Sequence, residues 1–337
     1  MRGPRIKEEG QGFYHIVSRI VDRRRVLDTK EKERFRDLMR RVEAFSGVQI
    51  LTYTILDNHF HILLMVPPRR EVSDEEFLVR MACLYDETVV QMLARELKVR
   101  REEKLPEAAE AMKARWVARM YDLSAFMKTL KQRITQSYNR RHGRVGTLWE
   151  ERFKSILVQG RPGALGTVAA YIDLNAVRAG IVGDPKDYRF SGYGEAMGGG
   201  ELARNGLGMV MGTLGQPQGW HEAATAYRQL VYVAGEAQGL DRFGNPTRPG
   251  FKPEVVRQVL EAGGQLSLPE LLRCRVRYFT DGVVMGTEDY VEGVFEKYRA
   301  RFGEKRESGA RPMRGGFAQL FTARRLRLNV ITIPATG

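Results

Sequence analysis

The sequence predicts a mixed α+β protein whose first strands pair antiparallel. Residues 13–20 and 48–56 have the alternating, aromatic and β-branched composition of strands, and the stretch between them has helical periodicity. A third strand-like segment, residues 59–66, follows the turn residues Asp57 and Asn58. Strands joined by so short a turn pair antiparallel. With 337 residues, 43% of them hydrophobic, the chain can build a large core and two domains.

Helical segments are expected on both sides of the second and third strands. The helix over residues 28–47 carries apolar residues at helical spacing and ends at Gly47. Pro67 and Pro68 end the third strand, because proline cannot donate a hydrogen bond to a neighbouring strand. Residues 69–117 are charged and lack strand signals, so we expect a helical insertion there.

An amphipathic helix is expected after the insertion, over residues 122–141, with Asp122 or Ser124 as its cap. Its apolar face repeats at every fourth residue, at Phe126, Leu130, Ile134 and Tyr138. A strand at residues 153–158 and a helix at residues 166–180 follow. These elements complete an alternation of strands and helices in the first two thirds of the chain.

The glycine run at residues 198–200 predicts a domain boundary. We expect one domain over residues 1–198 and a mainly helical accessory domain over residues 201–337. The second domain contains alternate arginines that would share one face of a strand but scatter around a helix, Arg273, Arg275 and Arg277. A DNA-binding role and a partner-binding or stabilising role are both open for it.

The charge balance points to a polyanionic partner. The chain has 55 basic and 41 acidic residues, a net charge of +14 and a pI near 9.9. Such an excess is typical of nucleic-acid binding. Cys83 and Cys274 do not form a disulfide framework, so we expect a reducing cytoplasm. No segment has the apolar core of a signal peptide or the roughly 18 apolar residues of a membrane span, so no membrane partner is expected.

Two histidines interrupt the apolar third strand. His59 and His61 are two apart, so their imidazoles lie on the same side of a strand, while Phe60 faces the opposite side. Two imidazoles can bind one divalent metal if a third ligand comes from elsewhere. The alternative is a structural pair whose nitrogens bond to polar neighbours, because an unpaired buried imidazole is costly.

A cationic segment with aromatic residues follows the amphipathic helix. Guanidinium and ammonium groups neutralise phosphates, and aromatic faces accept unpaired bases. The candidate DNA-binding residues of this segment are Arg140, Arg141, Arg144, Trp149, Arg152 and Lys154. The alternative is a solvated basic helix end, favoured by the helix dipole, with a core tryptophan.

Three segments of the sequence, in the order given, match the motifs of one known family: LDNHFHILL, FMKTLKQRITQSYNRRHGRVGTLWEERFKS and YIDLNAVRAGIVGDPKDYRFSGYG. Together they resemble the REP-associated tyrosine transposases of the HUH endonuclease group, over about residues 5–195. The resemblance implies a ferredoxin-like central antiparallel sheet with helices. It also implies Mg²⁺ or Mn²⁺ held by His59 and His61, with Asn139 or Gln136 as a third ligand, of which we favour Asn139.

The resemblance further implies a helical tyrosine that attacks a DNA phosphodiester and forms a 5′-phosphotyrosine, which conserves the bond energy for rejoining. Relatives have a tyrosine four or five residues before the asparagine of their N-R-R segment. Ile134 and Thr135 occupy those positions before Asn139 here. Tyr138, the sole tyrosine of its helix, is the expected nucleophile, and Tyr121 is the alternative.

The predicted function is therefore a metal-dependent, transposase-like tyrosine endonuclease that cuts and rejoins single-stranded, hairpin-forming DNA. Its partner would be single-stranded or hairpin DNA, and it would act as a monomer or homodimer. Two alternatives belong to other classes. One is a catalytically impaired protein that binds hairpin DNA without cutting it, and the other is an RNA-binding protein with a structural histidine pair.

Overall fold

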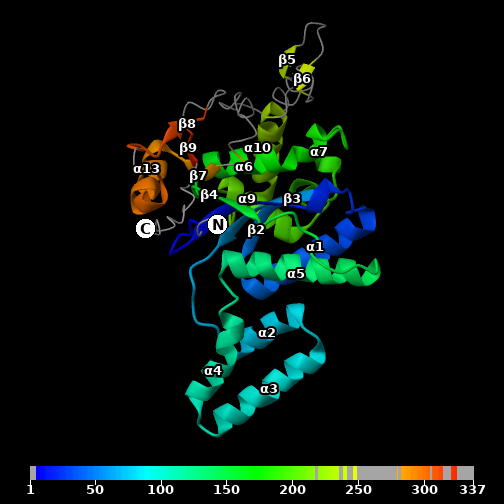
Figure 1. The fold of residues 1–337 in the computed structure, drawn as a ribbon, viewed down its shortest axis with the longest axis vertical. Coiled ribbons are helices and arrows are strands. Elements are labelled where there is room, and N and C mark those ends of the chain that lie inside the picture. The colour runs from blue at the N-terminus through cyan, green and yellow to red at the C-terminus, as the bar shows by residue number, and fades with distance from the viewer. Residues whose placement is uncertain are drawn as a thin grey trace, which may run out of the picture.

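A four-stranded antiparallel sheet lies at the centre of the computed structural model (Figure 1). The structure describes residues 5–216, 219–234, 238–240, 246–248, 279, 282–303, 306–313 and 320–324. The strand order is β2-β3-β1-β4, and β1 runs antiparallel to both of its neighbours. This order, with one helix after the first strand and one before the last, is the ferredoxin-like βαββαβ arrangement, so the predicted α+β class is confirmed. Its elements are β1 (Gly12–Arg19), α1 (Thr29–Ser46), β2 (Gln49–Ile55), β3 (His59–Val66), α5 (Leu123–Arg141) and β4 (Lys154–Val158).

The register of β1 and β3 decides which side chains share a face. Val17 lies opposite His61, and Arg19 lies opposite His59. Lys154 of β4 pairs with Val17 from the other side. Because side chains directly opposite each other point the same way, these five residues share one face of the sheet.

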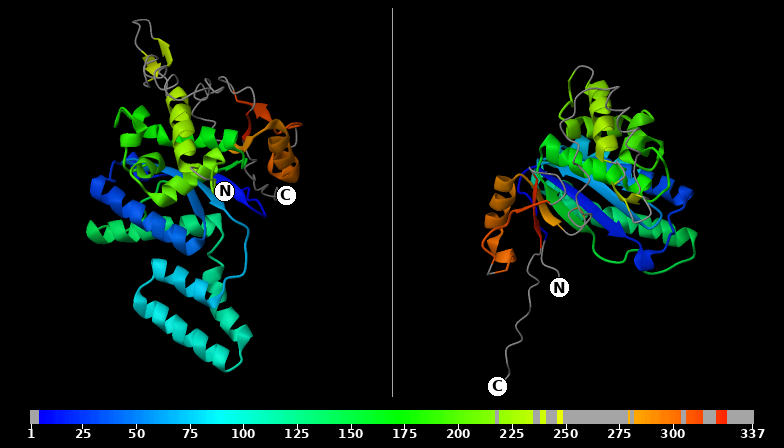
Figure 2. Two further views of the ribbon diagram at one scale, coloured as in Figure 1. Left: turned by 180° about the vertical axis from the view of Figure 1, so that it is seen from behind. Right: turned by 90° about the horizontal axis from the view of Figure 1, so that it is seen from above.

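Helices cover both faces of the sheet, so it is the middle layer of three (Figures 1 and 2). One face packs against α1 and α5 and contains Phe60, Ile62 and Leu64 of β3. The opposite face, which carries the histidine pair, packs against α6, α8, α9 and α10. The helices of that side are α6 (Pro162–Asp173), α7 (Asn175–Arg178), α8 (Gly192–Met197), α9 (Glu201–Met211) and α10 (Gly219–Ala234).

The two helices beneath the sheet begin and end where the sequence predicts. The Asp28 carboxylate accepts a hydrogen bond from the Glu31 amide at 2.8 Å, which caps α1. Gly47 ends that helix with φ of 70°, a left-handed conformation that costs glycine little. Of the two predicted caps of α5, Asp122 is the one used, since it accepts from the Ala125 amide at 2.7 Å.

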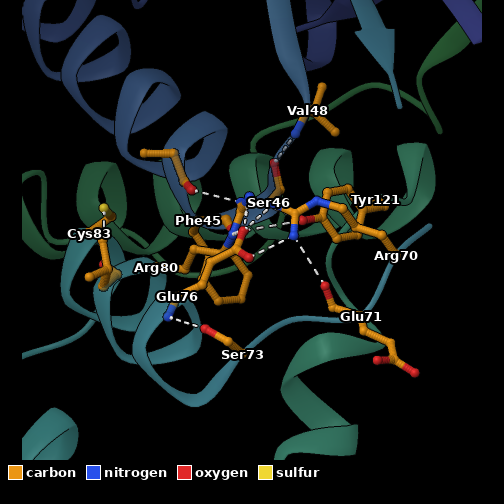
Figure 3. A network of polar contacts seen from close by, with 12 residues as sticks. Phe45, Ser46, Val48, Arg70, Glu71, Ser73, Glu76, Arg80, Cys83 and Tyr121 are labelled. Atoms are coloured by element: carbon orange, nitrogen blue, oxygen red, sulfur yellow. Dashed lines mark hydrogen bonds and ion pairs between the residues drawn. The ribbon is translucent and has the colours of Figure 1, made fainter. Parts of the chain in front are cut away.

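Three helices project from the body of the protein beyond α5: α2 (Asp74–Leu84), α3 (Glu87–Glu102) and α4 (Pro106–Val117). A polar network connects α2 to the end of α1 (Figure 3). The Glu76 carboxylate accepts hydrogen bonds from Arg70 and Arg80. The Arg80 guanidinium also donates to the carbonyl of Ala44 at 3.2 Å and to the hydroxyl of Tyr121 at 3.1 Å. The insertion is thereby anchored to the sheet-covering helices.

The C-terminal part of the chain extends the same sheet. β7 pairs parallel with β4, and β9 and β8 continue the sheet to seven strands. α8 and α9, which lie on either side of residues 198–200, pack on the same sheet face. The described residues on both sides of the predicted boundary therefore share one core, and strands accompany the helices expected there. The remaining elements are β5 (Gln238–Leu240), β6 (Pro246–Arg248), β7 (Gly282–Gly286), α13 (Glu288–Lys297), β8 (Arg311–Pro312), β9 (Phe321–Arg324) and the short 3₁₀ turns η1 (Val21–Arg23), η2 (Pro185–Asp187) and η3 (Arg299–Arg301).

One prediction concerns residues outside the described part of the chain. Arg273, Arg275 and Arg277 lie outside them, so the strand or helix reading of those arginines stays open. Within the described part of the chain, no helix combines the length and apolar character needed to cross a membrane.

Candidate active site

The two histidines of β3 lie side by side on one sheet face, as their spacing predicts. The ring centroids of His59 and His61 are 5.2 Å apart. His61 is 2% exposed, whereas His59, at the start of the strand, is partly exposed. The pair therefore has one buried member and one that solvent or a ligand can reach.

The outer histidine has its ring orientation fixed by the residue before it. Nδ1 of His59 lies 2.7 Å from the Asn58 side-chain oxygen. The amide nitrogen of Asn58 donates to the carbonyl of Arg23 at 3.0 Å, so the Asn58 oxygen is the acceptor toward His59. Nδ1 of His59 then carries the proton, and Nε2 keeps its lone pair for a ligand.

The inner histidine is held by a third histidine on β1. Nδ1 of His61 lies 3.0 Å from Nε2 of His15, and the two rings are stacked. Burial lowers the pKa of His15 to about 3. Burial, followed by the neighbouring His15, also lowers the pKa of His61, and burial and Arg19 lower the pKa of His59 to about 4. All three rings are neutral at pH 7, which is the form that binds metals.

A tyrosine of α6 contacts this histidine group from above the sheet. The ring centroid of Tyr171 is 5.7 Å from that of His61 and 5.9 Å from that of His15. Phe279 stacks on its other side with a centroid distance of 4.2 Å, and the ring is 3% exposed. The Arg178 guanidinium lies 5.0 Å from its centroid. Helices α6 and α7 thus place a hydroxyl-bearing ring and a cation beside the candidate metal ligands.

Asn175 lies one helical turn beyond Tyr171 and is partly buried. Its amide nitrogen donates to the carbonyls of Tyr171 and Ile172 at 2.8 and 3.1 Å. The amide oxygen keeps its lone pairs, which suit a divalent cation. Across the described ranges, no three His, Cys, Asp or Glu side chains gather as a metal site.

The structure does not bring the predicted nucleophile together with the histidines. Tyr138 belongs to the core beneath the sheet, on the side of Phe60, and its ring stacks on His142 with centroids 4.1 Å apart. Asn139, the predicted third ligand, donates from its amide to the carbonyl of Gly146 at 2.9 Å. Since His61 points to the opposite face, β3 separates both residues from the pair.

The alternative nucleophile Tyr121 and the alternative ligand Gln136 also lie away from the histidine pair. Tyr121 lies in the polar network that anchors the helical insertion, and its hydroxyl accepts from Arg80. Burial raises the pKa of Tyr121. Gln136 is exposed on α5. The helix predicted to supply the nucleophile is therefore a packing element in this structure.

The candidate DNA-binding residues divide into buried and exposed members. Trp149 is 6% exposed, packs on Phe60 at 5.5 Å between centroids and donates from Nε1 to the Thr135 hydroxyl at 2.9 Å. A ring so enclosed has no free face for a base, which corrects the expected stacking role. Arg141 forms an ion pair with Glu31. The members exposed or partly exposed to solvent are Arg140, Arg141, Arg144, Arg152 and Lys154.

Sequence reasoning missed His15, Tyr171 and Arg178. One signal could have found the tyrosine: Tyr171 stands four residues before Asn175, which is the spacing sought without success before Asn139. His15 gave a weaker signal, because only the register of β1 against β3 shows that it lies beside His61.

Comparisons with known proteins match parts of the chain. Residues 10–76, which include β1 to β3, match the family model described as transposase IS200 like. The ISDra2 transposase TnpA of Deinococcus radiodurans is 25% identical over 72 residues, which are 20% of this chain and 51% of that protein. The chain thus spans about half the length of this curated relative.

A solved structure described as a REP-associated tyrosine transposase bound to a REP hairpin covers 59% of this chain and 87% of its own, with a TM-score of 0.39 and 16% identity. A likeness at this level does not by itself establish a shared fold. The fold and site observed here define an α+β protein with a ferredoxin-like sheet and a histidine pair on one face. Through residues 10–76, the chain resembles the IS200-like transposases.

Proposed function

We propose that this protein is a metal-dependent endonuclease that cuts and rejoins single-stranded, hairpin-forming DNA through a tyrosine. The observation that carries the proposal is the contact between Tyr171 and His61, 5.7 Å between ring centroids. A nucleophile must lie beside the group that holds the reacting phosphate. Tyr171 meets this condition, whereas Tyr138 lies beneath the sheet.

The residues fit a divalent ion such as Mg²⁺ or Mn²⁺. His59 and His61 would hold it through Nε2, because their Nδ1 atoms are already bonded to Asn58 and His15. The amide oxygen of Asn175 is the candidate third ligand. When bound, such an ion polarises the scissile phosphate and stabilises the charge that develops on its oxygens.

In the proposed reaction, the Tyr171 oxygen attacks phosphorus in line with the 3′ oxygen. The bond from phosphorus to that oxygen breaks, the 3′ oxygen receives the proton that the tyrosine loses, and a 5′-phosphotyrosine remains. The Arg178 guanidinium beside the ring stabilises the developing negative charge. Attack by a 3′-hydroxyl on the phosphotyrosine reverses these steps and rejoins a strand.

The same site supports a second candidate function, a DNA-binding protein that does not cut. Tyr171 is 3% exposed and is covered by the ring of Phe279. A phosphate reaches the tyrosine oxygen only if the residues that enclose the ring move. A protein in which that movement does not occur would bind hairpin DNA through its basic surface without forming a covalent bond.

The two functions differ in one measurement. Wild-type protein is incubated with a labelled DNA hairpin that has single-stranded flanks, with and without Mn²⁺, and denatured before electrophoresis. The endonuclease gives a labelled protein band that needs the metal. His59→Ala and His61→Ala should lose that band yet bind the hairpin almost as tightly, because phosphate contacts supply most of the affinity. Hairpin binding without any covalent band would support the non-cutting function, and a preference for the RNA hairpin would contradict both.

A further inference from the structure

A small cavity opens beside the histidine pair, at the point where β4 diverges from β1. The two segments pair between Val17 and Lys154, and again where the Glu150 amide donates to the carbonyl of Arg19 at 3.0 Å. Between these two contacts, β1 has one residue, Ser18, and the other segment has residues 151–153. The longer segment must arch away, and a cavity of about 160 Å³ is left.

The cavity has a cationic lining. Four cations line it, Arg19, Arg23, Arg152 and Lys154, together with two carboxylates, Glu150 and Glu151. The positive excess continues below it: burial, and then Arg152, lower the pKa of Arg5 to about 10. Burial, and then Arg5, likewise lower the pKa of Lys131 to about 8. An anion bound in the cavity would relieve this repulsion.

The backbone that presents Arg23 is strained. Asp22 and Arg23 have φ of 56° and 54°, a left-handed conformation that non-glycine residues rarely adopt. Asn58 holds this turn by donating to the carbonyl of Arg23 at 3.0 Å, and the same side chain accepts from His59. Strain of this kind is retained where the surroundings enforce it, commonly at functional sites. The cavity loop and the candidate metal ligand are thus fixed by one residue.

The cavity lies close to the histidine pair. Arg19 and Val17 stand directly opposite His59 and His61 on the neighbouring strand. Adjacent strands are about 4.8 Å apart, so the cavity on the far edge of β1 is one to two strand spacings from the imidazoles.

We infer that this cavity binds a backbone phosphate of the DNA strand, adjacent to the phosphodiester that is cut. The inference rests on the proposed function for the identity of the strand. The cations neutralise the phosphate, and the strand is thereby set across the histidine face. The cavity fixes the position of the strand and takes no part in bond breaking.

The test removes one phosphate charge at a time. A hairpin with single-stranded flanks is made with a single neutral methylphosphonate linkage at each flank position in turn, and its affinity is measured without metal. At one position we expect a loss of about tenfold with wild-type protein, since a hydrogen bond to a charged group contributes about 1.5–3 kcal/mol. In Arg152→Ala, the same neutral linkage should lower hairpin affinity only slightly, because the contact between Arg152 and that phosphate is already absent.

Arg95→Ala is the matched control, since Arg95 is an exposed cation on α3 that does not line the cavity. The loss of hairpin affinity caused by Arg95→Ala should add to the loss caused by each neutral linkage. The inference is overturned if no linkage shows coupling to Arg152.

These outcomes are separate from the test of the proposed function. A metal-dependent covalent band would support the proposed endonuclease. If the affinity losses from Arg152→Ala and from every neutral linkage also add fully, the phosphate-binding role of the cavity is wrong. Coupling between Arg152 and one linkage, in a protein that forms no covalent band, would support the phosphate-binding cavity and contradict the endonuclease.

Discussion

Nε2 of His15 lies 3.0 Å from Nδ1 of His61, and the two rings stack with an interplanar angle of 18°. For Nε2 of His61 to bind a metal, its Nδ1 must carry the proton and donate it to His15. His15 must then present an unprotonated Nε2, so its own proton is on Nδ1. His15 is therefore a positioning residue that selects the metal-binding tautomer of His61.

Removing this acceptor should weaken metal binding. His15→Leu fills the site without an acceptor, whereas His15→Gln returns an oxygen near the place of Nε2. Partners of metal-binding histidines typically contribute about 10–100-fold to metal affinity. We expect His15→Leu to lose Mn²⁺ affinity on this scale and His15→Gln to recover most of it, as measured by titration of free Mn²⁺ by electron paramagnetic resonance. Equal affinities for wild type and His15→Leu would rule out the positioning role.

The buried carboxyl of Asp173, at the end of α6, should make the stability of the protein depend on pH. Asp173 accepts hydrogen bonds from Thr52 at 2.9 and 3.0 Å and from Tyr227, yet burial outweighs these donors and raises its pKa from 3.8 to about 7. Between these two values the folded state holds a proton that the unfolded state releases. The free energy of unfolding therefore falls as pH rises through this interval.

Asp173→Asn removes this titration while keeping an oxygen that accepts from Thr52. Relative to the variant, the wild type should lose up to about 1.4 kcal/mol of unfolding free energy per pH unit between about pH 4 and 7. Chemical denaturation at several pH values measures the difference, with Asp37→Asn, an exposed residue of α1, as the matched control. A difference between wild type and Asp173→Asn that does not change with pH would show that Asp173 does not titrate in this range.

Trp149 should behave as a core residue. Its indole is enclosed by Phe60 and hydrogen-bonded to Thr135 on α5. Trp149→Ala should lower the free energy of unfolding by about 3–5 kcal/mol, as truncation of a buried aromatic side chain does. Trp149→Phe should lose less and bind the hairpin as the wild type does. A stable Trp149→Ala that binds only the single-stranded flank more weakly would restore the base-stacking role.

The first part of the fold follows from local patterns, and this is why the sequence predicts it. The alternation in β1, the caps Asp28 and Gly47 and the turn at Asn58 are short-range signals that agree with one another. The shared face of the histidines also follows, because two-residue spacing fixes direction on any strand. Strand β7, of sequence GVVMG, carries no alternation, and its pairing with β4 depends on contacts far along the chain.

The candidate nucleophile could not be derived in the same way. Tyr171 and His61 are 110 positions apart in the sequence, and only the packing of α6 on the histidine face brings them together. The family resemblance predicts the nucleophile in the helix that ends at Arg141, because relatives have a tyrosine before their N-R-R segment. The strand order instead places that helix under the opposite face, so its tyrosine became part of the core.

The central claim is that Tyr171 forms the covalent bond to DNA. Wild type, Tyr171→Phe and Tyr138→Phe are compared with the labelled, flanked hairpin and Mn²⁺, and the labelled peptide is identified by mass spectrometry after proteolysis. Both variants keep their aromatic rings, so a melting curve of each verifies that the fold is intact. We predict that the covalent band disappears in Tyr171→Phe, persists in Tyr138→Phe, and carries the label on residue 171 in the wild type. Persistence of the band in Tyr171→Phe, with the label on Tyr138, would contradict the claim.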